Sequence, residues 1–179
     1  VLGVQLELAT SLEAEIQKRQ QEEQRREALE KALAGPLAAG RVTLDNGKIG
    51  ISGNVLFAHN SDQLQPEGKQ LLQTLAPPIT AYLGASDQIL MNSGFTDDMP
   101  VRDNNRKFAD NWELSAQRAL TVTRTLIDEG VPSNAIFAAA FGAQQPVADN
   151  ADPEGRARNR RVEMAPVPKS STNGKAAND

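Results

Sequence analysis

Apolar residues recur along the first part of this chain at a spacing that favours a helix. Residues 6–33 are rich in Glu, Gln, Arg, Lys, Leu and Ala, all of which are good helix formers. Residues 17–26 contain no apolar side chain, so this helix cannot bury a continuous stripe by itself. We expect either a stalk or weak coiled coil, or a solvated helix lying along a domain, ending at Gly35-Pro36. Leu8, Leu12 and Ile16 fall at helical spacing in its first part, as do Leu29 and Leu33 further on.

An alternating pattern replaces the helical one after residue 40. Residues 41–44 and 48–51 alternate on either side of Asp45-Asn46-Gly47, and an Asn-Gly step in this context predicts a β-hairpin. We expect residues 55–57 (Val-Leu-Phe) to extend the second strand or to begin another.

Helical spacing returns twice in the second half. One helix is predicted to begin at Pro66-Glu67 and to be broken or kinked at Pro77-Pro78. The other covers residues 111–129 and is closed by Gly130. The apolar faces are Leu71, Leu72, Leu75 and Ile79 in the first helix, and Leu114, Ala119, Val122, Leu126 and Ile127 in the second.

Short apolar segments between these helices predict three more strands, at residues 88–95, 135–141 and 161–164. Strands alternating with helices after an opening hairpin predict an α/β (α+β) sandwich, in which helices pack on one face of a mixed sheet. We therefore divide the chain into a helical stalk or linker (1–35), one domain (36–165) and a disordered tail (166–179) rich in Pro, Ser, Lys and Asn.

Composition narrows the function classes. The net charge of −4 argues against nucleic acid as the main partner, because phosphate binding needs a basic surface. The chain has no cysteine, which excludes disulfides, thiolate metal sites and a cysteine nucleophile. Asp97, Asp98, Asp103 and Asp110 do not have the spacing of a calcium-binding loop, so we predict no metal site and no cofactor.

Two residues suggest a binding chemistry. Asp97 follows a predicted strand, and Arg118 lies in the first turns of the predicted helix 111–129. A guanidinium offers two parallel N–H donors to a carboxylate, whereas a carboxylate accepts from an ammonium. Together the two residues suit a small zwitterion. The alternative is that Asp97 only caps a turn and Arg118 is a solvated surface residue.

Phe57 through Arg161 resembles the OmpA-like peptidoglycan-binding domain, which also occurs in MotB and Pal. Five segments carry the resemblance in family order: Phe57 with the loop ending in residues 64–67, Gly94-Phe95-Thr96-Asp97, residues 114–119 (LSAQRA), Phe141-Gly142 before Pro146, and residues 159–163 (NRRVE). The resemblance implies a non-catalytic protein that holds the diaminopimelate-containing stem peptide of peptidoglycan. It places Asp97 on the ligand ammonium and Arg118 on its carboxylate. Further groove residues that it implies are Phe57, Thr96, Asn111, Leu114 and Arg160, the last preferred to Arg161.

Among these proteins, the sequence motifs of the chain most resemble those of MotB-type stator proteins. The resemblance lies in Thr96-Asp97-Asp98 followed by Pro100, and in residues 111–115 (NWELS). That resemblance implies a periplasmic, homodimeric module. The full-length protein would be tethered to the inner membrane through a helix ahead of Val1, next to a multi-span partner subunit. The polar segment 99–110 is longer than in Pal and OmpA and predicts an extra loop beside the groove.

Three other functions compete with this interpretation. One is an outer-membrane or lipoprotein-type wall tether without a motor role. Another is a wall-peptide hydrolase using Asp97 or Asp98 with the lone histidine, His59, but no metal, activated nucleophile or poised carboxylate pair can be assembled for it. The third is a purely structural dimerisation domain with the N-terminal helix as its coiled coil.

Overall fold

The computed structural model of the chain describes residues 2–45, 47–101 and 107–169. Its elements along the chain are α1 (Leu2–Ala38), β1 (Val42–Asp45), β2 (Lys48–Ser52), α2 (Gly53–Leu56), α3 (Pro66–Ala85), β3 (Gln88–Phe95), α4 (Asn111–Asp128), a 3₁₀ turn (Ser133–Ala135), β4 (Ile136–Gly142), α5 (Pro153–Asn159) and β5 (Arg161–Pro168). Within this part of the chain, no helix is both long enough and apolar enough to cross a membrane.

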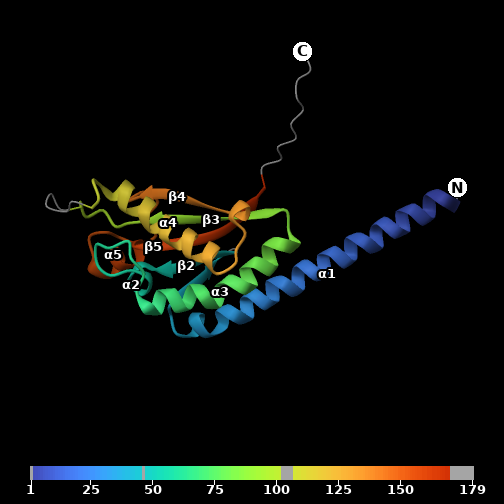
Figure 1. The fold of residues 1–179 in the computed structure, drawn as a ribbon, viewed down its shortest axis with the longest axis horizontal. Coiled ribbons are helices and arrows are strands. Elements are labelled where there is room, and N and C mark those ends of the chain that lie inside the picture. Colours follow the sequence, from blue (N-terminus) through green and yellow to red (C-terminus); the bar gives the residue numbers. More distant parts are fainter. Residues whose placement is uncertain (1, 46, 102–106, 170–179) are drawn as a thin grey trace, which may run out of the picture.

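The five strands form one mixed sheet in the order β1-β2-β5-β3-β4. All neighbours are antiparallel except β3 and β4, which run parallel. Helices α3 and α4 pack on each other and on the sheet (Figure 1). This arrangement confirms the predicted α/β sandwich, and its core consists of buried side chains from both layers, among them Leu72, Leu75, Val122, Leu126, Val162 and Met164.

The β3–α4 contact fixes where the functional residues lie. Thr96, directly after β3, donates its backbone N–H to the carbonyl of Gly142 at the end of β4 (2.7 Å). Gly94 faces the carbonyl oxygen of Ser115 on α4 so closely that a Cβ at this position would overlap it. The end of β3 and the second turn of α4 are therefore held side by side.

The N-terminal helix is longer than predicted. It continues through Gly35-Pro36 to Ala38, and Gly40 (φ +72°) ends it. The N–H of Arg41 bonds the carbonyl of Pro36 (3.0 Å) and that of Gly40 bonds the carbonyl of Leu37 (3.1 Å), the pattern in which a glycine closes a helix. The predicted stop was wrong because Gly40 is the residue that adopts the left-handed conformation.

The two halves of α1 differ in their contacts with the domain. Its C-terminal half lies along α3, with Leu33 fully buried and Leu29 and Leu37 packed against the core. Its N-terminal half projects beyond the domain (Figure 1), and Leu12 and Ile16 there are more than half exposed.

Other predictions also needed correction. Residues 55–57 do not continue a strand, because Ser52 caps the short helix α2 by accepting the N–H of Asn54 (3.3 Å). Helix α3 is not broken at Pro77-Pro78, since buried Leu75 and Ile79 hold it against the core on both sides.

The C-terminal region contains more regular structure than predicted. Helix α5 was missed, although Asp152 caps it by accepting the N–H of Glu154 (3.1 Å) and Pro153 occupies its first turn. Strand β5 continues to Pro168 and so takes in the first residues of the predicted tail, because Pro166 and Val167 lie opposite Leu90 and Ile89 of β3. The remaining tail residues 170–179 lie outside the described residues.

A substitution at Gly94 tests the β3–α4 contact. We expect Gly94→Ala to lower the free energy of unfolding by about 3 kcal/mol, the upper part of the usual range for forcing an extra methyl into a packed core, because the obstacle is backbone. Gly84→Ala is the matched control, since nothing lies within 4 Å of that Cβ in α3 and alanine favours a helix. Urea denaturation measures both, and equal stabilities of the two variants would contradict the contact.

Candidate functional site

A pocket of about 250 Å³ lies where the end of β3, the first turns of α4 and the end of α5 meet. Six of the seven predicted site residues line it: Thr96, Asp97, Asn111, Leu114, Arg118 and Arg160. The seventh, Phe57, is buried beneath Arg118, with the guanidinium carbon 5.2 Å from its ring centroid. The structure therefore brings all seven together at one place, six of them as lining and one as support.

Asp97 both caps a turn and holds an arginine. Its Oδ1 accepts the N–H of Met99 (3.1 Å), and its Oδ2 accepts from Nη1 of Arg160 (2.7 Å). Thr96 fixes the backbone here, since its hydroxyl donates to the Asp97 carbonyl (2.8 Å). Asn111, the first residue of α4, donates to the carbonyl of Met99 (3.0 Å). Because the turn is tied to both β3 and α4, the carboxylate has a fixed position at the pocket wall.

Arg118 is held in a different way. Its Nε donates to the carbonyl of Ser61 (3.0 Å), and its guanidinium lies over the Phe57 ring. Only 6% of the residue is exposed, and it forms no salt bridge with the described residues. Two contacts therefore fix this buried cation, and neither of them neutralises its charge.

The pKa of Arg118 is lowered to about 10. Burial is the largest cause, because a desolvated guanidinium is harder to protonate, and the positive charge of Arg160 acts in the same direction, whereas Asp97 and Asp62 partly oppose the shift. The unfolded chain holds this proton more tightly, so protonated Arg118 opposes folding at every pH below about 10. Raising the pH from about 10 toward the ordinary pKa of an arginine relieves the cost. At neutral pH the group stays charged and lacks a close counter-ion.

Arg160 and Arg161 are adjacent in the chain but make different contacts. Arg160, which caps the end of α5, lines the pocket and pairs with Asp97, as sequence reasoning preferred. Arg161, the first residue of β5, stacks on the ring of Phe95, with 3.9 Å from its guanidinium carbon to the ring centroid, and pairs with Glu163 (2.8 Å).

Sequence reasoning missed several residues of the pocket. His59, Asn60 and Arg156 were not predicted to lie in the groove, yet all three line it, together with Met99, Pro100 and Val101 from the start of the predicted loop beside it. Arg156 reaches the pocket from α5, where its Nη1 donates to the carbonyl of Asn150 (2.9 Å). An Asp-Pro-Glu start signal at residues 152–154 was the one pattern that pointed to α5.

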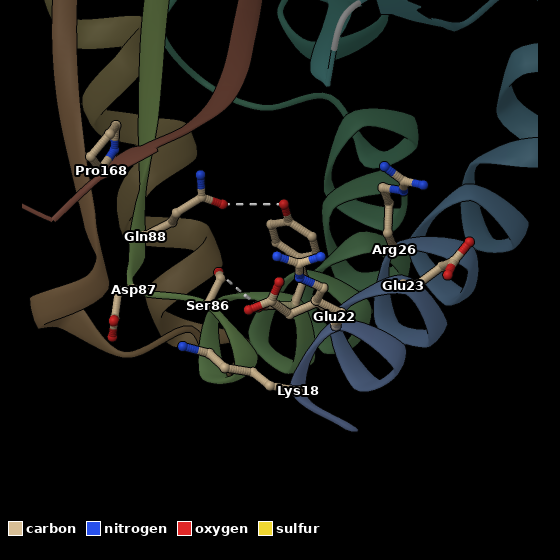
Figure 2. A pocket seen from close by; sticks show the side chains of 10 residues that line it. Lys18, Glu22, Glu23, Arg26, Ser86, Asp87, Gln88 and Pro168 are labelled. Atoms are coloured by element: carbon tan, nitrogen blue, oxygen red, sulfur yellow. Dashed lines mark hydrogen bonds between the residues drawn. The ribbon is translucent and has the colours of Figure 1, made fainter. Parts of the chain in front are cut away.

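Three larger cavities lie elsewhere among the described residues. One of about 700 Å³ separates α1 from the corner between α3 and β3, and charged side chains such as Lys18, Glu22 and Arg26 line it (Figure 2). A second, about 480 Å³, lies between Lys69 of α3 and Thr125 of α4, and a third, about 450 Å³, lies over Phe95 and neighbouring residues of the sheet. None of the three is lined by Asp97 or Arg118, so cavity size does not identify the site.

Within residues 2–45, 47–101 and 107–169, no group of three or more His, Asp or Glu side chains is placed to hold a metal ion. Asp103, a member of the acidic set considered above, lies outside these ranges, as does the centre (102–106) of the predicted extra loop.

The profile of the OmpA family matches residues 56–160, which contain both Asp97 and Arg118. This chain belongs to the OmpA family. Outer membrane protein A of Bordetella avium is 33% identical over 117 residues, which are 65% of this chain and 56% of the relative. Peptidoglycan-binding protein ArfA of Mycobacterium tuberculosis is 36% identical over 112 residues, 63% of this chain and 32% of the relative. The chain thus spans little more than half, or less, of these relatives.

Solved structures share the same architecture. The cell wall anchor of the T6SS from Pseudomonas aeruginosa superposes with a TM-score of 0.68 at 31% identity, covering 76% of this chain and 94% of that one. A putative MotB like protein from Desulfovibrio vulgaris gives a TM-score of 0.68 at 30% identity, covering 83% of this chain and 97% of that one. The resemblance inferred from sequence motifs is confirmed at the level of the family and the fold.

Replacing Asp97 in this OmpA-family domain tests its role as the counter-ion of the pocket. We expect Asp97→Asn to lower the free energy of unfolding by about 2 kcal/mol, because it leaves Arg118 and Arg160 as uncompensated neighbouring cations. The value is below that of a fully buried pair, since Arg160 keeps 26% of its side chain exposed. Adding Arg118→Met should recover part of the loss.

The matched control is the adjacent, exposed Asp98, where Asp98→Asn should change stability by less than about 0.5 kcal/mol. Chemical denaturation at neutral pH measures all three variants. If Asp97→Asn were as stable as Asp98→Asn, the charge balance described for the pocket would be wrong.

Proposed function

We propose that this protein is a non-catalytic peptidoglycan-binding module that anchors a membrane protein complex to the cell wall from the periplasm. OmpA-family domains of this kind are non-catalytic, and one relative is named for peptidoglycan binding. The observation that carries the proposal is the buried, unneutralised guanidinium of Arg118 beside the carboxylate of Asp97 in one pocket.

The proposed ligand is the stem peptide, held at diaminopimelate. Its carboxylate would accept two N–H donors of Arg118, and its ammonium would donate to Asp97. Asp97 retains acceptor capacity for this, since each carboxylate oxygen has two lone pairs and each accepts one hydrogen bond in the free protein. A pocket that excludes much of the solvent raises the value of such pairs above the ~0–1 kcal/mol of an exposed ion pair.

Thr96, Asn111, Leu114 and Arg160 have supporting roles in this proposal. Leu114, one turn before Arg118 on α4, gives the wall an apolar surface, and Asn111 holds the turn after β3. Phe57 supports the Arg118 guanidinium from below instead of lining the groove. Arg160 adds a second cation near the carboxylate position.

For the wider assembly, we favour a MotB-like stator subunit that acts as a homodimer with a multi-span inner-membrane partner. The likeness to a putative MotB like protein supports this, as does the projecting half of α1, which suits a spacer between a membrane and a wall. A tether without a motor role, of the outer-membrane or lipoprotein type, is the second candidate, because Outer membrane protein A is similar over the same domain.

Co-sedimentation with purified sacculi tests the proposed binding. The parent protein should be depleted from the supernatant, without release of soluble muropeptides. Asp97→Asn and Arg118→Met should each weaken binding by about 1–3 kcal/mol, the usual cost of leaving a buried charged partner unpaired.

Two charge-matched controls accompany these variants. Asp98→Asn removes an exposed carboxylate next to Asp97, and Arg124→Met removes an exposed guanidinium further along α4. Both should bind like the parent. Parent-like co-sedimentation of Asp97→Asn and Arg118→Met would refute the pocket assignment, and no depletion of the parent protein would refute wall binding itself.

A further inference from the structure

We propose that the pocket selects stem peptides whose diaminopimelate carboxylate is free and rejects those in which it is amidated. This inference rests on the proposed function and adds a chemical requirement to it. It follows from the charge balance of the pocket and from the different ways in which its arginines are held.

The charges that line the pocket do not cancel. Three arginines, at positions 118, 156 and 160, line it together with one aspartate, Asp97. The Asp97 carboxylate already forms a salt bridge with Arg160, at 2.7 Å from its Oδ2. It therefore pairs with Arg160, which is more exposed, and not with Arg118. The pocket of the free protein therefore carries excess positive charge, and a ligand with no net charge would leave that excess in place.

The excess positive charge is energetically least favourable at Arg118. It is 6% exposed, and its only protein acceptor among the described residues is the Ser61 carbonyl, which is bound through Nε. Its lowered pKa, caused first by burial and then by Arg160, shows that the surroundings disfavour the cation. A ligand anion at its two terminal nitrogens would supply the counter-charge that the protein does not.

Arg118 cannot move to find another partner. The bond to Ser61 and the stacking on Phe57 fix its position. The side chain of Arg160, by contrast, keeps 26% exposure, while its backbone is pinned by the Gly53 N–H bonded to its carbonyl (2.8 Å). Arg118 is therefore the residue with a fixed position that would recognise the carboxylate of the ligand.

Amidation of the diaminopimelate carboxylate removes the negative charge and one of the two acceptor oxygens that Arg118 would bind. A carboxylate presents two charged acceptor oxygens to a guanidinium, and the match is bidentate. A carboxamide of nearly the same shape keeps one neutral acceptor and turns an N–H₂ donor toward the Arg118 donors. Because the loss combines a charge, a hydrogen bond and a buried unpaired donor, we expect affinity to fall at least about tenfold.

Chemically amidated sacculi provide the test. Sacculi treated with a carbodiimide and ammonia carry carboxamides in place of free carboxylates, and untreated sacculi from the same batch are the reference. The parent protein should bind the untreated sacculi at least tenfold more tightly. General electrostatics would act in the opposite direction, because the chain carries a net charge of −4 and the treatment removes negative charge from the wall.

Arg118→Met assigns the selectivity to its residue, with Arg124→Met as the control on the same helix. The first variant should bind both preparations equally and weakly, whereas the second should retain the parent's preference. Thermal unfolding by circular dichroism checks that both variants are folded, and the comparison of the two preparations with the parent protein requires no variant.

The outcomes separate the selectivity, its assignment to Arg118 and the proposed function. Equal binding of the parent to both preparations overturns the selectivity and leaves the proposed function standing. Retained selectivity in Arg118→Met overturns the assignment to that residue. Failure of the parent to bind even untreated sacculi overturns the proposed function itself.

Discussion

The site depends on a buried guanidinium that the protein holds in place without neutralising it. Arg118 stacks on Phe57 and donates to the Ser61 carbonyl, and its burial lowers its pKa to about 10. A protein selected only for stability would favour an apolar side chain here, because an unpaired buried charge costs free energy. The arrangement is understandable if the missing counter-ion arrives with a ligand, and the fold provides it with a position next to Asp97.

The sheet and α4 set this geometry through backbone contacts. Gly94 allows the Ser115 carbonyl of α4 to approach β3, and the bond from Thr96 to Gly142 fixes the turn that carries Asp97. The carboxylate and the guanidinium therefore come from two elements whose separation is determined by close packing. Such rigidity lowers the conformational cost of binding.

Local patterns predicted the parts of the structure that local interactions determine. The Asn-Gly hairpin, β3 and the helix from Asn111 were found because turn chemistry and periodicity agree there. The combination of Asp97 with Arg118 came from residue chemistry and motif resemblance, whereas Arg156 from the short helix α5 and His59 from a loop reach the pocket through tertiary packing that no periodicity encodes. The end of helix α1 was predicted incorrectly because Gly40, and not Gly35, adopts the left-handed conformation that closes the helix.

A structure of the protein bound to the tripeptide L-alanyl-γ-D-glutamyl-meso-diaminopimelate tests the central claim most directly. The account predicts that the diaminopimelate carboxylate lies within hydrogen-bond distance of both terminal nitrogens of Arg118, with the neighbouring ammonium against Asp97. A bound peptide that leaves the Arg118 guanidinium without an anion, or that occupies the cavity between α1 and α3, would contradict it.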